Sequence, residues 1–264
     1  MGASESNFSM KQIFSRIGFW LFLPLSALQG LWLRRSATRL PEAAGKRNGE
    51  FGQGTTLKLL AMGDSIIAGV GTGRMERSLP VQFAQAIAET RGCCVQWRVE
   101  GSNGADIAAL RQQITQLVPG QLNQAWKADV ILISIGVNDV TGLSSTRRWR
   151  LQVNALMAEL KENWPKAQII FAGLPPMGRF PLPPQPLRFT LGLRAATLDA
   201  IAAKAISRQT NMLHIPTDID PVKEEFCEDG FHPSAESCGR WAKELAQRFE
   251  ADNLGGYTSH GGST

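Results

Sequence analysis

The sequence predicts an α/β domain of three layers, in which helices cover both faces of a mostly parallel five-stranded sheet. Five short apolar segments alternate with longer segments of helical periodicity, an order typical of parallel strands joined by crossover helices. One of them, residues 129–135, is a continuous run rich in β-branched side chains, as expected for a strand covered on both faces. At 264 residues the chain is long enough for one such domain and its appendages.

The expected elements follow one another in regular order. Strands are predicted at residues 57–62, 95–99, 129–135, 168–172 and 211–215, and helices at 80–91, 105–117, 147–163, 191–208 and 235–251. The first helix illustrates the reasoning, because Val81, Ala84 and Ile87 recur at helical spacing and Pro80 suits a first turn. The domain therefore spans residues 57–253. Residues 36–56 lack periodicity and are interpreted as a linker, and residues 254–264 as a disordered tail.

An uncharged and mostly apolar run, residues 17–33, dominates the N-terminal segment 1–35. These seventeen residues would span roughly 25 Å as a helix, at the low end for a hydrocarbon core of about 30 Å. Trp20 and Trp32 near the ends of the run suit the membrane interface. An uncleaved membrane anchor is the favoured interpretation, with a cleaved signal peptide or an interfacial docking helix as alternatives. The basic flank is slightly heavier after the run, which favours a cytoplasmic location for the domain, whereas a cleaved signal would mean export.

Charge, glycine spacing and cysteine spacing exclude several other classes of protein. The net charge is +5, but seven basic and three acidic residues among the first fifty account for +4 of it. A domain so close to neutral lacks the basic surface of a nucleic-acid-binding protein. Gly69, Gly71 and Gly73 do not match the spacing of a dinucleotide-binding loop. No pair of cysteines has C-x-x-C spacing, so no metal and no cofactor is expected, and a Cys227–Cys238 bridge is an alternative to free thiols if the domain is exported.

His232 is the histidine best placed for catalysis. Of the three histidines, His260 lies in the Gly/Ser-rich tail and His214 in an apolar segment, whereas His232 closely follows a carboxylate in a loop. A serine nucleophile needs a base, and that base needs an acceptor on its other ring nitrogen. Asp229 and His232 supply the acceptor and the base as one local unit. Ser65, directly after the first predicted strand, is the candidate nucleophile.

Two further polar segments follow predicted strands and therefore belong at the same edge of the sheet. Gly101 opens a Gly-Ser-Asn-Gly segment after the second strand, where a glycine permits close approach to a ligand and leaves its N–H free to donate. Asn138 follows the third strand, and its side-chain amide can donate into the site. Asp139 is an alternative orienting carboxylate, but we favour Asp229 because it lies three residues from the histidine.

Together these segments resemble the SGNH, or GDSL-type, hydrolase family over roughly residues 57–253. The family is named after a Ser, a Gly, an Asn and a His in separate blocks, and the chain matches all four in order. Gly63-Asp64-Ser65-Ile66 resembles the nucleophile block, Gly101 the oxyanion glycine with Gly104 nearby, Gly136-x-Asn138-Asp139 the asparagine block, and Asp229-x-x-His232-Pro233 the Asp/His block. The resemblance implies a flavodoxin-like α/β/α sandwich with esterase or lipase activity.

The mechanism that the resemblance implies agrees with the chemistry of these residues. His232 would take the proton of Ser65, with Asp229 holding the imidazole in the required tautomer. Ser65 would attack an ester carbonyl, and the N–H groups of Ser65 and Gly101, together with the Asn138 amide, would stabilise the oxyanion. Water would then release the acyl group. The sequence has no Gly-x-Ser-x-Gly, which separates this arrangement from the nucleophile elbow of α/β-hydrolases.

A proline-rich segment, residues 173–186, follows the fourth predicted strand and is expected to overhang the site. Its apolar residues Leu174, Met177, Phe180 and Leu182 are candidates for an acyl pocket, and a rigid connector is the alternative. The sequence therefore predicts a serine esterase acting on lipid-like or short acyl esters, in contact with a membrane through residues 17–33. An O-deacetylase of glycans, an acyltransferase and a non-catalytic binding module on the same fold are the alternatives.

Overall fold

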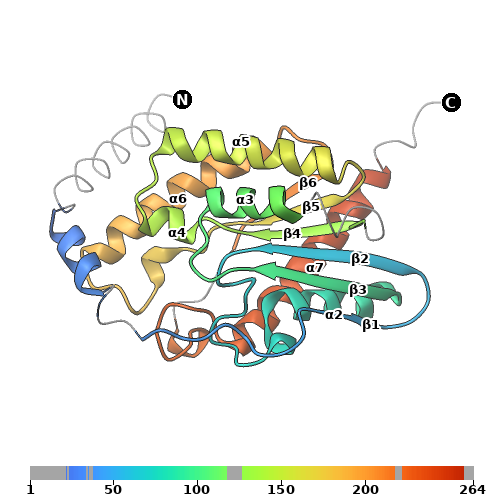
Figure 1. Ribbon diagram of the computed structural model, residues 1–264, viewed down its shortest axis with the longest axis horizontal. Coiled ribbons are helices and arrows are strands. Elements are labelled where there is room, and N and C mark those ends of the chain that lie inside the picture. The colour runs from blue at the N-terminus through green and yellow to red at the C-terminus, as the bar shows by residue number, and fades with distance from the viewer. Residues whose placement is uncertain are drawn as a thin grey trace, which may run out of the picture.

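The computed structural model describes residues 22, 24–33, 35, 38–117, 127–217 and 222–258. Most of the predicted anchor segment before residue 24, and residues 259–264 of the predicted tail, lie outside the described residues. The described chain forms one mixed sheet with helices on both of its faces (Figure 1). The predicted α/β/α architecture is therefore confirmed.

Six strands form the sheet in the order β1-β3-β2-β4-β5-β6. Their bounds are β1 Asn48–Phe51, β2 Thr56–Gly63, β3 Cys94–Gly101, β4 Val130–Ser134, β5 Gln168–Ala172 and β6 Met212–Ile215. Strands β2 to β6 are parallel and correspond to the five predicted strands, and β1 pairs antiparallel with β3 at one edge. The chain runs from β2 to β3 and then crosses back to β4, so the strand order reverses at β2, where sheets of this kind bind their ligands.

Helices connect the strands and cover the sheet (Figure 1). Their bounds are α2 Leu79–Arg91, α3 Ile107–Leu117, α4 Val137–Thr141, α5 Thr146–Asn163, α6 Leu187–Ile206 and α7 Ala235–Thr258, with 3-10 helices η1 Met75–Arg77, η2 Met177–Arg179 and η3 Lys223–Glu225. All five predicted helices are present. Helix α7 continues into the segment predicted to be a tail, because extending an existing helix costs far less than starting one.

The two faces of the sheet bury separate apolar clusters. Along β2, Leu59 and Ala61 belong to the cluster under α2 and α7, whereas Leu60 and Met62 belong to the cluster under α3, α5 and α6. All four residues are at most 1% exposed. Successive side chains of a strand point to opposite faces, so a strand covered on both faces must be apolar at every position.

Residues 38–47, which we call the strap, are packed onto the domain although the sequence predicts a linker there. The Ala43 amide donates to the Ala68 carbonyl at 3.1 Å, beside the turn that follows β2, and the Gly71 amide donates to the Pro41 carbonyl at 3.2 Å. The rest of the predicted linker includes β1. The strap lacks sequence periodicity because its hydrogen bonds go to the turn after β2 and to β3, not to a regular element of its own.

Residues 24–33, within the predicted anchor run, form a helix that lies against the domain (Figure 1). We call it the N-terminal helix. Ser26 is 3% exposed, its Oγ lies 3.2 Å from Thr190 Oγ1, and Gln29 bonds to the backbone at the start of α6. Among the described residues, no helix combines the length and the apolar character that crossing a bilayer requires.

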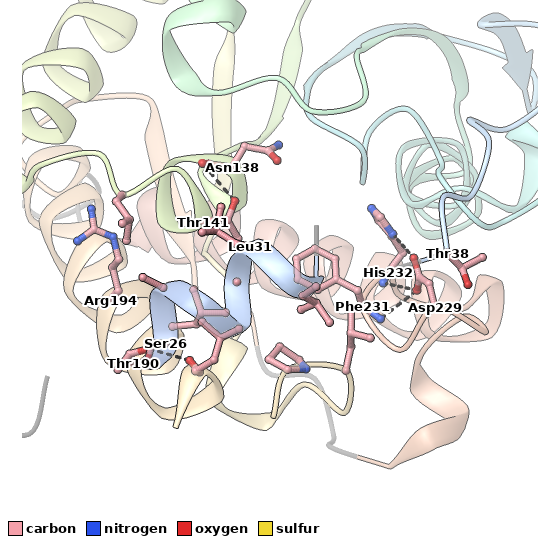
Figure 2. Close-up of a pocket in the computed structure, with 18 residues that line it drawn as sticks. Ser26, Leu31, Thr38, Asn138, Thr141, Thr190, Arg194, Asp229, Phe231 and His232 are labelled. Atoms are coloured by element: carbon pink, nitrogen blue, oxygen red, sulfur yellow. Dashed lines mark hydrogen bonds and ion pairs between the residues drawn. The ribbon is translucent and has the colours of Figure 1, made fainter. Parts of the chain in front are cut away.

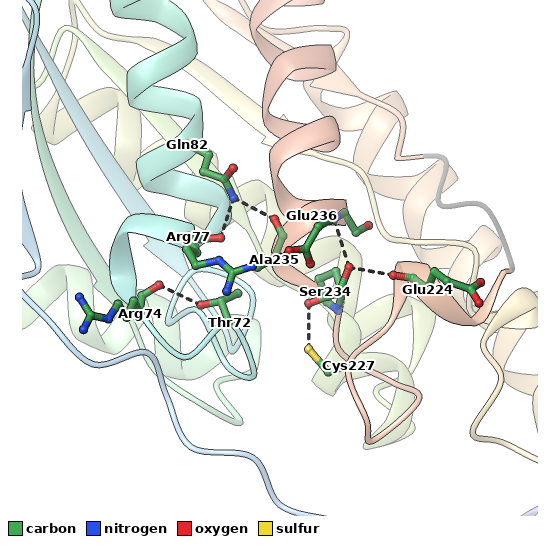
Figure 3. Close-up of polar contacts among 11 residues, drawn as sticks. Thr72, Arg74, Arg77, Gln82, Glu224, Cys227, Ser234, Ala235 and Glu236 are labelled. Atoms are coloured by element: carbon green, nitrogen blue, oxygen red, sulfur yellow. Dashed lines mark hydrogen bonds and ion pairs between the residues drawn. The ribbon is translucent and has the colours of Figure 1, made fainter.

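Polar contacts tie the start of α7 to α2 (Figure 3). Gln82 Nε2, on α2, donates to the Arg77 carbonyl at 2.6 Å and to the Ala235 carbonyl at 3.0 Å. Ser234 precedes α7, and its hydroxyl donates to the Glu224 carbonyl at 3.0 Å. These bonds fix the loop before α7 relative to the helix that follows the first parallel strand.

Helix α6 passes η2 at a contact between two glycines. A Cβ added to Gly192 would lie 2.6 Å from the Gly178 Cα and 2.8 Å from its nitrogen. These are backbone atoms, so no side chain can swing aside to make room. The contact brings the segment after β5 close against α6.

We expect Gly192→Ala to destabilise the fold by about 1–3 kcal/mol, because the added methyl group meets backbone. Within a helix, Gly→Ala alone stabilises by about 0.5–1 kcal/mol. A loss of stability would therefore show that the added methyl group meets the backbone at Gly178. Gly239→Ala in α7 is the matched control, since a Cβ there meets only the flexible end of Gln82, and we expect it to be near neutral. Urea unfolding measures the stability of both variants. If Gly192→Ala is as stable as Gly239→Ala, α6 can move away from η2 to make room for the methyl group.

Candidate active site

Ser65 lies in a tight turn directly after β2. Gly63 ends the strand, and a Cβ there would lie 1.9 Å from the Ser134 carbonyl oxygen of β4, so only glycine fits. The turn is closed by a hydrogen bond of 2.9 Å from the Ala68 amide to the Asp64 carbonyl. Ser65 is thereby held at the carboxyl end of β2, at the reversal of strand order.

The loop between η3 and α7 holds Asp229 and His232 as one unit. Asp229 Oδ1 accepts from the amides of Phe231 and His232 at 2.9 and 3.0 Å, and Oδ2 lies 2.6 Å from His232 Nδ1. Burial by itself would raise the pKa of Asp229, but the bonds from the His232 ring and from the two amides hold that pKa below its ordinary value. Asp229 is therefore ionised at neutral pH and orients the imidazole.

The fold joins this unit to the serine. His232 Nε2 lies 3.0 Å from Ser65 Oγ, so Asp229, His232 and Ser65 form one chain of hydrogen bonds. With Nδ1–H donating to the carboxylate, Nε2 accepts the serine hydroxyl. Phe231 packs edge-on against the imidazole with ring centroids 5.4 Å apart. The three predicted residues are thus brought together, although Ser65 and His232 lie 167 positions apart in the sequence.

Asp64, next to the serine, is a fully buried carboxyl group. Its Oδ1 accepts from the Ile66 amide at 3.1 Å, whereas Oδ2 has no hydrogen-bond partner among the described residues. Burial raises the pKa of Asp64 to about 7; the Ile66 bond and His232 oppose this rise, and Asp139 adds to it. A proton on Asp64 is therefore part of the folded structure at mildly acidic pH.

Asn138 lies in α4, directly after β4, and lines the same pocket as His232. Its Nδ2 donates to the Ala105 carbonyl at 2.9 Å. An amide nitrogen carries two hydrogens, so the second N–H is left for a ligand. The prediction that Asn138 belongs to the site is consistent with this position.

The Asp139 carboxylate bonds to groups other than His232. Its carboxylate accepts from the Ile107 amide at 2.9 Å and from the Ser144 hydroxyl at 2.9 Å. Burial raises its pKa, and these two bonds oppose the rise. The alternative in which Asp139 orients the histidine is therefore replaced by the observed bond between Asp229 and His232.

Gly101, the predicted oxyanion glycine, does not present its amide to the serine. The Gly63 carbonyl accepts from the Ser102 amide at 3.1 Å. Because backbone groups alternate in direction along a strand, the N–H and C=O of Gly101 point to the opposite side of β3. Its carbonyl accepts there from Arg47 at 2.8 Å, on the side away from β2 and Ser65.

Gly104 is the glycine of this segment with a free amide. It adopts a φ of 80°, and a Cβ added to it would meet no atom within 4 Å. Among the described residues, no group accepts a hydrogen bond from the amides of Gly104 or Ser65. The bond from Asn138 to Ala105 keeps this loop beside the pocket. The Asn103-Gly104 pair, typical of a left-handed turn, was the signal for this position in the sequence.

A pocket of about 470 Å³ opens beside the histidine (Figure 2). Asn138, Asp229 and His232 line one part of it. Most of the remaining lining is apolar and comes from the N-terminal helix, the segment before α6, and α6 itself. In Figure 2, Leu31 of the N-terminal helix lies between the Phe231–His232 loop and Arg194. That this helix borders the site was not predicted, because it lies far upstream of the site residues in the chain.

One of the four residues predicted to line an acyl pocket lies in this pocket, namely Leu182. Leu174, Met177 and Phe180 are at most 6% exposed and belong to the core cluster under α6. The segment turns inward at η2 because Gly178 allows it to approach α6, and these three side chains fill the core as a result.

The cysteines and the potential metal ligands form no second centre in the described part of the chain. No group of three or more His, Cys, Asp or Glu side chains there could hold a metal ion. All four cysteines are free thiols, so the alternative Cys227–Cys238 bridge is not formed. Burial raises the pKa of Cys227 to about 11 and that of Cys238 to about 12, which keeps both protonated at neutral pH.

A serine at the carboxyl edge of a parallel sheet, hydrogen-bonded to a His–Asp pair beside an apolar pocket, is the arrangement of an α/β/α serine hydrolase. The family model described as GDSL-like Lipase/Acylhydrolase matches residues 61–240. The chain belongs to this family and is an ester hydrolase of the SGNH type, as the resemblance of its sequence implied. A search of curated proteins finds no match.

Solved structures with the same fold include both carbohydrate esterases and lipases. A carbohydrate esterase family 2 enzyme from Corynascus thermopiles (Myceliophthora fergusii) has a TM-score of 0.59 at 15% identity, over 80% of this chain and 68% of that chain. An extracellular lipase from Streptomyces rimosus has a TM-score of 0.53 at 17% identity, over 73% and 99%. A family two carbohydrate esterase from Clostridium thermocellum has a TM-score of 0.55 at 16% identity, over 81% and 67%. Similarity at this level of identity shows the fold alone.

We expect Asp64→Asn to change how stability depends on pH. The Asp64 carboxyl has a pKa of about 7 in the folded protein against an ordinary 3.8, so its stabilising contribution is complete below pH 3.8 and is lost as the pH rises to about 7. The asparagine is neutral at every pH. The free energy of unfolding of the variant, minus that of wild type, should therefore rise by up to about 1.4 kcal/mol per pH unit across that window. Urea unfolding at several pH values measures this difference, and a flat difference would mean that Asp64 is already ionised when folded.

Proposed function

We propose that the chain is a serine esterase that hydrolyses carboxylic esters with apolar acyl groups through an acyl-enzyme. The observation that carries this proposal is the relay of hydrogen bonds from Asp229 through His232 to Ser65, at 2.6 and 3.0 Å. His232 acts as the general base, and Asp229 stabilises the imidazolium that forms. The substrate class is argued from the lining of the pocket.

The reaction proceeds in two halves. Ser65 Oγ attacks the ester carbonyl carbon while its proton passes to His232 Nε2. His232 then gives that proton to the departing alkoxide, so the alcohol leaves and the acyl group stays bonded to Ser65. Water enters, loses a proton to His232 and attacks the acyl-enzyme, and the carboxylic acid departs as Ser65 regains its proton.

Three donors are available for the negative charge that develops on the carbonyl oxygen. They are the free amides of Ser65 and Gly104 and the second N–H of Asn138. Gly104 takes the role that the sequence assigned to Gly101, since the Gly101 backbone is directed toward Arg47. Losing one such donor costs about 3–4 kcal/mol in transition-state stabilisation in other enzymes.

The pocket supports a hydrocarbon substituent over a sugar. A glycan deacetylase must satisfy several hydroxyl groups next to the serine, whereas most of the surface that lines this pocket is apolar. A non-catalytic binding module would not need the hydrogen bonds that join Asp229, His232 and Ser65, so we do not favour that alternative. An acyltransferase shares every step up to the acyl-enzyme and differs only in its acceptor, so water as acceptor is the simpler assignment.

We expect a fluorophosphonate probe to label the full-length protein and Ser65→Ala to abolish the label, because the probe bonds to the activated hydroxyl. Ester turnover should fall about 10⁴-fold or more in Ser65→Ala and about 10²–10⁴-fold in His232→Ala, because both act as one unit. Labelling gels and the hydrolysis of nitrophenyl esters measure these effects.

Ser102→Ala serves as the control, since Ser102 is exposed in the neighbouring loop and belongs to no part of the proposed relay. It should keep both the label and the turnover. A Ser65→Ala protein that still labels would show that the nucleophile is another residue, and a folded wild type that neither labels nor hydrolyses any ester would overturn the esterase proposal.

We also propose that the domain works at a membrane surface. Leu25 and Trp32 lie on one face of the N-terminal helix and are 50% and 64% exposed. They belong to the apolar run of residues 17–33, which has basic residues on both sides. Outward apolar side chains flanked by basic ones suit a helix lying in the headgroup region of an anionic bilayer.

We expect the full-length protein to sediment with vesicles that contain phosphatidylserine, and the double variant Leu25→Glu/Trp32→Glu to bind them at least about tenfold more weakly, because carboxylates replace apolar contacts with the lipid. Leu151→Glu is the control, since Leu151 is 60% exposed on α5 and outside the helix. If the double variant binds the vesicles as tightly as the control does, the N-terminal helix does not contact the lipid.

A further inference from the structure

The N-terminal helix contributes a wall to the pocket beside His232. Ala27, Gly30 and Leu31 of this helix line the same pocket as the histidine. The helix lies outside residues 61–240, the part of the chain that the family model matches. Figure 2 shows the helix beside the loop that carries Phe231 and His232.

The helix is held in place by specific polar bonds. Gln29 Oε1 accepts from the Leu187 amide at 3.0 Å, and Gln29 Nε2 donates to the Gln185 carbonyl at 2.8 Å. The Leu187 amide is at the first turn of α6, where no carbonyl of its own helix can reach it. The buried Ser26 hydroxyl adds a bond of 3.2 Å to Thr190. Two polar side chains of an otherwise apolar run thus match two backbone groups and a hydroxyl of the domain.

Most of the side chains that α6 and the segment before it contribute to the pocket are apolar. Leu182, Leu187 and Leu191 line the pocket, Thr190 and Arg194 are the polar residues of α6 in the lining, and Phe231 lines the pocket beside His232. An ester bound at Ser65 has two substituents, the acyl chain and the alcohol. We infer that the N-terminal helix closes an acyl-chain site and that Gly30 sets its length, so that the enzyme prefers longer straight acyl chains over acetyl. This inference rests on the proposed esterase function.

Gly30 marks the open space of that site. A Cβ added to Gly30 would meet no atom within 4 Å, although the residue lines the pocket. A side chain at this position therefore has room beside the pocket and need not displace the helix. Leu28, two residues earlier, is 66% exposed and does not line the pocket. The pair offers one position directed at the acyl site and one directed away from it on the same helix.

The test uses the full-length protein and p-nitrophenyl esters from acetate to dodecanoate, assayed below their micellar concentrations. Each buried methylene should raise kcat/KM about fourfold, equivalent to about 0.8 kcal/mol, until the site is full. In the series Gly30→Ala, Gly30→Leu and Gly30→Trp, the ratio of kcat/KM for octanoate to that for acetate should fall step by step, by at least about tenfold for Gly30→Trp. Leu28→Trp, the matched control, should leave the ratio at the wild-type value.

The outcomes separate this inference from the esterase proposal. A graded fall of the ratio with side-chain size supports the acyl site, because detachment of the helix would act equally in all three variants. A ratio that is unchanged in Gly30→Trp, or that falls equally in Leu28→Trp, overturns it while hydrolysis itself stands. If the series changes the discrimination among alkyl acetates instead, the pocket takes the alcohol part and the inference fails. A folded wild type that neither reacts with the fluorophosphonate probe nor hydrolyses any ester overturns the esterase proposal, and the inference falls with it.

Discussion

The hydrogen bond between His232 Nε2 and Ser65 Oγ forms only where two distant parts of the fold are held in place. It joins a turn fixed by the centre of the sheet to a loop fixed by the last helix, and at 3.0 Å it tolerates little displacement of either. Helices α2 and α7 cover the same face of the sheet, and Gln82 on α2 bonds to the backbone at Ala235. The packing of these two helices therefore determines whether the serine and its base meet.

The packing around Ser65 is so dense that a neighbouring strand position has room only for glycine. A Cβ on Gly101 would lie 2.3 Å from the Ala68 nitrogen, so β3 can pass the serine turn only with a glycine there. Gly101 is thus required by close packing, and the free amide of the loop belongs to Gly104. The same density buries Asp64, whose Oδ2 has no partner among the described residues. A carboxyl in that position is most stable with its proton, as its raised pKa indicates.

The sequence was sufficient to predict the five parallel strands and the five main helices, because each follows from a local pattern. It also selected Ser65, Asn138, Asp229 and His232 from short spacings, and the fold brings these residues to one edge of the sheet. Strand β1 was missed because an edge strand of four residues carries too little periodicity. Gly101 was preferred over Gly104 because the direction of a backbone N–H changes at every residue of a strand, and element ends are not predictable to one residue. The place of the N-terminal helix in the pocket wall could not be predicted, because an apolar helix of the same composition can either pack on a domain or enter a bilayer.

The strap also supports the segment after β3 that contains Gly104, the proposed oxyanion donor. Glu42 Oε1 accepts from the Asn103 amide at 2.7 Å, and Arg47 pairs with Glu42 while donating to the Gly101 carbonyl at 2.8 Å. These two strap side chains therefore hold the segment on both sides of Ser102 and leave Gly104 as its unpaired donor. The strap follows the N-terminal helix by a few residues, so one stretch of chain supplies both a wall of the pocket and the support of the oxyanion loop. Residues 24–33 and 38–47 therefore border or support the proposed site, although they lie outside residues 61–240, which the family model matches.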